Sequence, residues 1–280
     1  MRAFLLMLLT TAALLAQPAR KTVFVITDAE GVAGVCRQDQ TEPKDSEMRQ
    51  LLTGEINAAV EGFFEGGADE VIVWDGHDGS QTLSALTIHP RARLLMGKLP
   101  PTMTFERRYT ALAFIGQHAR ANRKGGIMAH SFSSLGIQTM LMNGQPVGEI
   151  ETNAAVAGAY GTPVIFLSGD RAASEDLHAI VPDAELAVVK EGLANYVCLT
   201  MSATAARNLI RERATAAMRK AGSIKPYRVD GPVTIQIERT TRSALDMEAQ
   251  VSRPEAEVID ARTVRYHGAN FLEAWIRARH

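Results

Sequence analysis

The sequence predicts an α/β protein: three α/β/α layers around a mostly parallel sheet, followed by a smaller C-terminal α+β unit. Through the first two-thirds of the chain, short apolar runs alternate with stretches of helical periodicity, which is the order of a parallel sheet with crossover helices. The first run is almost continuously apolar, as in strands that are buried on both faces. From about Ala184 the pattern changes to strand-like runs interleaved with helices, and this change indicates the second unit.

The first β-α-β unit is predicted within residues 21–74. Residues 21–27 form its first strand, and residues 70–74 form its second. Between them, apolar side chains recur at helical spacing from Met48 to Phe63, and Gly66–Gly67 offers the left-handed conformation that ends a helix. Strand, helix and strand in this order predict a parallel pair with a right-handed crossover.

The remaining elements are predicted in the same way, and Asn143-Gly144 marks a tight hairpin turn. The first group comprises strands at 109–116, within 139–149 and at 163–167, with helices at 149–160, 172–180 and 203–220. The second unit contains strands at 185–191, 232–238 and 262–268, with helices near 243–251 and 270–279. We expect an α/β domain over residues 21–190 and a C-terminal α+β subdomain over residues 191–280.

The first 20 residues have the composition of a secretory signal peptide. Arg2 precedes an apolar run that ends at Ala16, and polar residues and a proline follow. The apolar run of about 14 residues is short of the ~20 that span a bilayer, which favours cleavage over a membrane anchor. We expect residues 1–16, or as far as residue 20, to be removed and the protein to be exported, periplasmic or secreted, with no membrane contact after cleavage.

The amino-acid composition and net charge argue against some classes of binding partner. A hydrophobic content of 46% is that of a globular protein, and a net charge of −1 argues against nucleic acid and against an anionic membrane surface. Cys36 and Cys198 are the two cysteines. In an exported protein they either form a disulfide or remain as two buried thiols, and the sequence leaves both open.

Polar side chains follow the predicted strands at the points where these end. Asp28 and Glu30 follow the first strand, His77 lies in "WDGHDG" after the second, and His118 lies in "GQHARA" after the third. Glu149 begins a helix beyond the Asn143-Gly144 turn. The carboxyl ends of parallel strands meet at one edge of a sheet, so these five side chains are expected to converge.

Three carboxylates and two imidazoles suit zinc or a similar cation, because all five donors are oxygen or nitrogen. Five ligands exceed the three of an open mononuclear catalytic zinc site, which favours two ions with Asp28 shared between them. Each residue also has a plainer interpretation: an acid after a strand caps the next helix, Glu149 suits the helix dipole, and His77 is a loop residue.

His130 lies in "GGIMAHS", behind two glycines that let the backbone pass close to a ligand. A histidine beside a metal site that is not needed as a ligand is a candidate proton carrier or nucleophile. His130 is therefore a candidate for this role, although by itself its position is weak evidence, since His89, His178 and His267 are also present.

Five segments in sequence order, "TDAEGVAGV", "WDGHDG", "GQHARA", "MAHS" and "NGQPVGEIETNAAVAG", resemble the motifs of the M55 peptidases, a family of zinc D-aminopeptidases. The resemblance implies an α/β fold and two zinc ions per subunit. Its implied ligands are Asp28, Glu30, His77, His118 and Glu149, with Asp28 shared. It also implies that His130 is catalytic and that the subunits form a ring-shaped homo-oligomer whose active sites face an inner chamber.

The activity implied is hydrolysis of the N-terminal peptide bond of short peptides that begin with a D-residue, such as D-Ala dipeptides. The alternatives are a metal-dependent amidase or esterase of other specificity, and an exported peptide-binding protein without catalysis. A purely structural zinc site is disfavoured because such sites usually contain thiolates.

Overall fold

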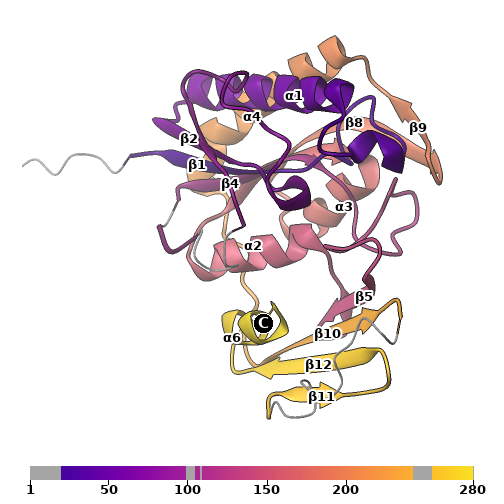
Figure 1. The fold of residues 1–280 in the computed structure, drawn as a ribbon. Coiled ribbons are helices and arrows are strands. Elements are labelled where there is room, and N and C mark those ends of the chain that lie inside the picture. The colour runs from indigo at the N-terminus through magenta and orange to yellow at the C-terminus, as the bar shows by residue number, and fades with distance from the viewer. Residues whose placement is uncertain (1–19, 99–104, 108, 242–253, 280) are drawn as a thin grey trace, which may run out of the picture.

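The computed structural model describes residues 20–98, 105–107, 109–241 and 254–279 (Figure 1). Within them, a seven-stranded sheet has the order β3-β2-β1-β4-β7-β8-β9. Neighbouring strands are parallel except for β8 and β9, which confirms the mostly parallel sheet. Its strands are β1 (Thr22–Thr27), β2 (Glu70–Trp74), β3 (Ala92–Leu95), β4 (Ala111–Gln117), β7 (Val164–Asp170), β8 (Glu185–Ala194) and β9 (Val197–Thr200).

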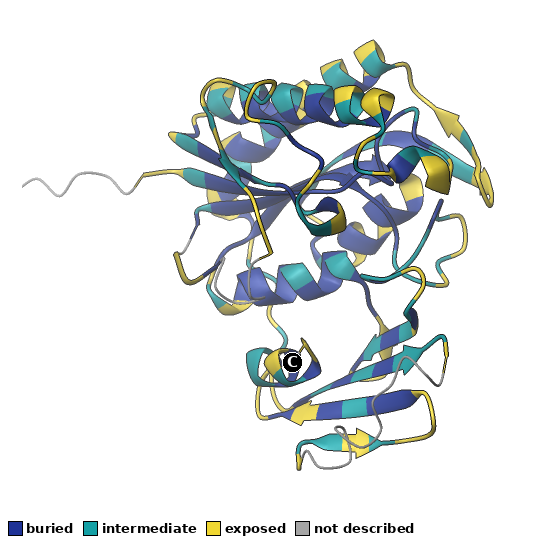
Figure 2. Cartoon of the chain, viewed as in Figure 1, coloured by how far each residue is buried: buried dark blue, intermediate teal, exposed yellow. Residues whose placement is uncertain are grey.

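Helices cover both faces of this sheet, as predicted. The helices α1 (Ser46–Glu65) and α4 (Ala203–Lys220) lie on one face, and α2 (Glu149–Ala159) and α3 (Arg171–Ile180) on the other (Figure 1). Figure 2 shows the buried residues concentrated in the central strands and on the inner faces of the helices. All seven residues of β4 are buried, which explains its continuous apolar run.

A second, five-stranded sheet has the order β11-β12-β10-β5-β6. Its strands are β5 (Ile137–Met142), β6 (Gln145–Pro146), β10 (Val233–Arg239), β11 (Ala256–Val258) and β12 (Thr263–Gly268), and helix α6 (Phe271–Arg279) accompanies it (Figure 1). Asn143 and Gly144 have φ of 50° and 78°, which are the left-handed values of the predicted turn between β5 and β6.

The expected boundary at residue 190 does not coincide with the division between the two sheets. Strand β8 is parallel to β7 and continues past residue 190, and β9 forms the edge of the same sheet. Conversely, β5 pairs with β10 in the second sheet. The chain therefore contributes β5 and β6 to the second sheet before it returns to the first sheet through α2. Because β5 pairs with the distant strand β10, no single boundary in the sequence separates the two sheets.

Two predictions lie outside the described residues: the signal peptide over residues 1–16 and the helix near 243–251. The strands β3, β9 and β11 are short and were not predicted. In the described part of the chain, no helix combines the length and apolarity needed to cross a membrane.

Candidate functional site

The candidate site lies at the point of the first sheet where the order in which the chain adds strands reverses. From β1, the chain adds β2 and β3 on one side and β4, β7 and β8 on the other. Ligands of open α/β sheets bind outside the carboxyl ends of the strands at such a switch point. Asp28 directly follows β1, and His118 directly follows β4.

The loops that leave β1 and β4 are held tightly together. The backbone N–H of Asp28 donates to the carbonyl oxygen of Ile115 at 2.8 Å, and that of Gly31 donates to Gly116 at 2.7 Å. A Cβ at Gly31 would lie 2.1 Å from the Gln117 carbonyl oxygen, and Gly116 has φ of 73°. Glycine is required at both positions, and this close approach places Asp28 and Glu30 beside His118.

The five side chains predicted as ligands lie together. His77 Nδ1 is 2.9 Å from Asp28 Oδ1 and 3.4 Å from Glu30 Oε2. His118 Nε2 is 3.3 Å from Asp28 Oδ2 and 3.2 Å from Glu149 Oε2. Asp28 is therefore central, with one carboxylate oxygen toward each histidine.

Backbone carbonyls fix the orientation of both rings. His77 Nε2 lies 2.7 Å from the Thr41 carbonyl oxygen, and His118 Nδ1 lies 2.8 Å from that of Ala119. A carbonyl can only accept, so each of these nitrogens carries a proton and donates it. The opposite nitrogens, His77 Nδ1 and His118 Nε2, then face the carboxylates, which is the usual arrangement of metal-binding histidines.

The histidines and carboxylates of this cluster strongly shift one another's pKa values even without a metal ion. Burial would lower the pKa of His77, but hydrogen bonds to Asp28 and Glu30 raise it to about 11. The pKa of His118 is also raised, because Glu149 and Asp28 outweigh its burial. Burial would raise the pKa of Glu149, but the His118 charge and hydrogen bond lower it to about 2. The carboxylates of this cluster are therefore stabilised by positive charge between them, which either protons on the histidines or metal ions can supply.

The donor set fits a metal. Glu30 is 3% exposed and His118 is 2% exposed. The Glu30 Oε2 and His118 Nε2 atoms are buried, and they face groups of opposite charge at 3.2–3.4 Å without a well-directed hydrogen bond among the described residues. Buried polar atoms normally have partners, so these two atoms suit coordination. Ligand atoms within 4.8 Å of one another form two overlapping groups, Asp28–Glu30–His118 and His118–His130–Glu149.

His130 lies against this cluster, as predicted. Its ring stacks on that of His118 with centroids 3.9 Å apart and an interplanar angle of 14°. Its Nδ1 is 2.9 Å from the Met128 carbonyl oxygen and donates to it, which leaves Nε2 as the free basic nitrogen. Met128 and Phe132 have φ of 50° and 60°, and such strained non-glycine backbone often occurs at functional sites.

Gln117 was not predicted from the sequence. Its Nε2 donates to Asp28 Oδ2 at 3.2 Å and to Glu149 Oε2 at 3.1 Å, so it holds these two carboxylates relative to each other. The one available signal was its position directly before His118 at the end of a strand.

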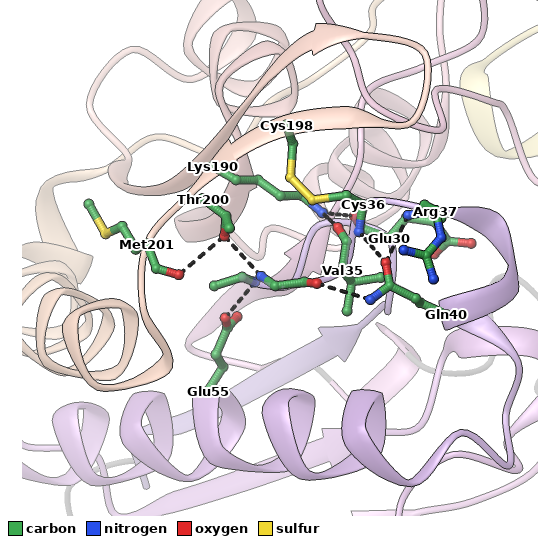
Figure 3. Close-up of a disulfide and its surroundings, with 12 residues drawn as sticks. Glu30, Val35, Cys36, Arg37, Gln40, Glu55, Lys190, Cys198, Thr200 and Met201 are labelled. Carbon is green, nitrogen blue, oxygen red and sulfur yellow. Dashed lines mark hydrogen bonds between the residues drawn. A yellow bond between two sulfur atoms is a disulfide. The ribbon is translucent and has the colours of Figure 1, made fainter.

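Lys190 and a disulfide hold the loop that carries Glu30 (Figure 3). The buried Lys190 ammonium donates to the carbonyl oxygens of Glu30 and Val35. Cys36 and Cys198 form a disulfide with Cα atoms 5.9 Å apart, which resolves the alternative left open by the sequence. The β8–β9 hairpin is thereby joined to the Glu30 loop by hydrogen bonds and by a covalent bond.

Removing this disulfide in a Cys36→Ser/Cys198→Ser double variant is expected to lower the free energy of unfolding. The cysteines are 162 residues apart, so the bond constrains a long loop, and the loss should be about 2–4 kcal/mol. Urea unfolding of the variant and of the oxidised parent measures the difference. A reductant that does not bind metals should destabilise the parent and leave the variant unchanged; equal stability of the two proteins would contradict the prediction.

A parallel α/β sheet with buried histidines and carboxylates at its switch point is the arrangement of a metal-dependent hydrolase. The sequence profile of the M55 peptidases, described as D-aminopeptidase, matches residues 22–278. The chain belongs to the M55 peptidase family, and it is an enzyme of the D-aminopeptidase type.

Two comparisons with known proteins agree with this assignment. A D-aminopeptidase of Bacillus subtilis (strain 168) is 27% identical over 259 residues, covering 90% of this chain and 93% of the relative. The solved structure of the Zn-dependent D-aminopeptidase DppA from Bacillus subtilis, described as a self-compartmentalizing protease, has a TM-score of 0.83 and 27% identity. That match covers 92% of this chain and 95% of the other.

Proposed function

We propose that this enzyme removes the N-terminal residue of short peptides that begin with a D-amino acid, such as D-Ala dipeptides, at a site with two zinc ions. The observation that carries the proposal is the convergence of Asp28, Glu30, His77, His118 and Glu149 with both imidazoles oriented by backbone carbonyls. Membership of the M55 family and the zinc dependence of a relative support it.

The ligands divide into two groups around Asp28. Glu30 and His77 would hold one ion, and His118 and Glu149 would hold the other, with Asp28 shared. The distances from Asp28 to both histidines support this division. When bound, the zinc ions supply Lewis acidity toward the scissile carbonyl and toward water.

His130 is the proposed catalytic residue. Its Nδ1 donates to the Met128 carbonyl, so Nε2 is the atom that takes or delivers a proton, or that attacks the substrate carbonyl. The stacked ring of His118 holds His130 beside the ligand cluster, where either step is within reach.

The setting of the enzyme is part of the proposal. The N-terminal 16 residues would act as a signal peptide and direct the protein to the periplasm or the medium. The Cys36–Cys198 disulfide supports an oxidising compartment of this kind. A relative is a self-compartmentalizing protease, which supports a ring-shaped homo-oligomer in which short peptides reach enclosed active sites.

A substrate panel with metal analysis tests the proposal. The purified mature chain should contain two zinc ions and hydrolyse D-Ala-D-Ala much faster than L-Ala-L-Ala or a simple amide. Loss of activity after chelation and its return with zinc would link the two observations. Equal hydrolysis of a simple amide would instead indicate an amidase, and a peptide-binding protein would yield neither stoichiometric zinc nor product.

A further inference from the structure

Arg279, in the last turn of α6, lies next to the candidate site although it comes from the second sheet unit. Its guanidinium carbon is 4.4 Å from the centre of the Phe132 ring and 5.4 Å from that of Trp275. The backbone N–H of Phe132 donates to Glu149 Oε1 at 2.6 Å. A single residue, Phe132, therefore connects this cation to a candidate metal ligand.

The guanidinium has no hydrogen-bond or ion-pair partner within the part of the chain that the structure describes, and the residue keeps solvent-exposed surface although its guanidinium lies near two rings. Its neighbour Arg277 differs: it donates to Glu273 and to the His267 carbonyl. Desolvation against the rings lowers the pKa of Arg279, Glu149 acts in the opposite sense, and Arg239 adds a second positive charge nearby. Arg279 thus has a second cation nearby, and in the described residues no carboxylate is bonded to its guanidinium, which leaves it available to an anion.

We propose that Arg279 binds the C-terminal α-carboxylate of the short peptide substrate. This inference rests on the proposed function and deepens it, because it says why the substrates are short. In a dipeptide the carboxylate belongs to the residue directly after the scissile bond, and consecutive Cα atoms are 3.8 Å apart. The carboxylate thus lies within a few ångströms of the reacting carbonyl, and in the structure the single residue Phe132 lies between the Arg279 guanidinium and Glu149.

The chemistry of the guanidinium suits the end of a peptide. In the proposed site the zinc ions would balance the charges of Asp28, Glu30 and Glu149, and the carboxylate of a dipeptide would gain a partner of its own in Arg279. The planar fork of a guanidinium matches a carboxylate with two parallel hydrogen bonds. The guanidinium carbon lies near the rings of Phe132 and Trp275, and no N–H of the group is bonded within the described residues, so its donors are available for the ligand. A longer peptide would place its carboxylate elsewhere and lose this contact.

The test compares D-Ala-D-Ala with its C-terminal amide, which differs only in the missing negative charge. The parent enzyme should prefer the free acid by roughly 10- to 100-fold in kcat/KM, the range of a charged hydrogen-bonded contact. Arg279→Gln should lower kcat/KM for the acid to about that of the amide while hydrolysis of the amide stays unchanged. Arg279→Lys should restore part of the preference, because it keeps the charge and loses the fork.

Arg277→Gln is the matched control, since it removes a cation from the same helix that already has partners; its preference for the acid should equal that of the parent. Hydrolysis of the amide reports the fold and the chemistry of each variant independently of the carboxylate. Equal rates for acid and amide in the parent, or an unchanged preference in Arg279→Gln, would overturn the inference and leave the proposed function intact. Hydrolysis of neither compound would overturn both.

Discussion

Replacing Asp28 with alanine is expected to empty both metal positions and to abolish turnover. Its two carboxylate oxygens face different histidines, with Oδ1 2.9 Å from His77 Nδ1 and Oδ2 3.3 Å from His118 Nε2. Loss of a partner outside the ligand shell typically costs 10–100-fold in metal affinity or activity. Loss of a ligand shared by two ions should cost more than about 100-fold at each.

The zinc content of the dialysed variants measures this effect. Glu30→Ala and Glu149→Ala are the matched controls, because each removes a carboxylate proposed to hold one ion: Glu30 is 3.4 Å from His77, and Glu149 is 3.2 Å from His118. Each control should retain one ion, whereas Asp28→Ala should retain neither. An Asp28→Ala protein that keeps one zinc ion would show that Asp28 belongs to a single metal position.

The local pattern of the sequence predicts the central strands of the first sheet well because they are buried on both faces, whereas the more exposed edge strands β3 and β9 were not predicted. Apolar runs such as that of β4 have few alternatives, and the helices between parallel strands follow from the connection that such strands require. The turn at Asn143-Gly144 is also local, since its left-handed backbone selects these residue types. What the pattern could not predict is the partner of β5, because pairing with β10 depends on tertiary contacts across a long stretch of chain.

The site shows the same distinction. Residues at the ends of adjacent parallel strands must lie close together, so Asp28 and His118 could be placed near each other from their order alone. Arg279 comes from a helix outside that sheet, and nothing in its own segment indicates that Phe132 would support it. Whether Cys36 and Cys198 form a disulfide could not be decided from the sequence for a similar reason, because the position of Cys198 depends on the antiparallel pairing of β9 with β8.

Replacing His130 with alanine is expected to lower kcat by about 10²–10⁴-fold, the usual contribution of a positioned acid or base, and to leave the zinc content unchanged. The reason is geometric: Nδ1 donates to the Met128 carbonyl, and Nε2 remains as the one reactive nitrogen of the ring. Steady-state kinetics with D-Ala-D-Ala and metal analysis of the same preparation give both quantities.

A second variant separates chemistry from packing, because the His130 ring also supports His118 through a stack of 3.9 Å. His130→Phe keeps an aromatic ring against His118 but has no nitrogen, so it should lose as much kcat as His130→Ala. If kcat recovers in His130→Phe, the role of His130 is to position His118. His130 Nε2 or Nδ1 also lies within 4.8 Å of ligand atoms of His118 and Glu149. Loss of one zinc ion in both variants would therefore make His130 a ligand, and the proton or acyl transfer would have to be assigned to another group.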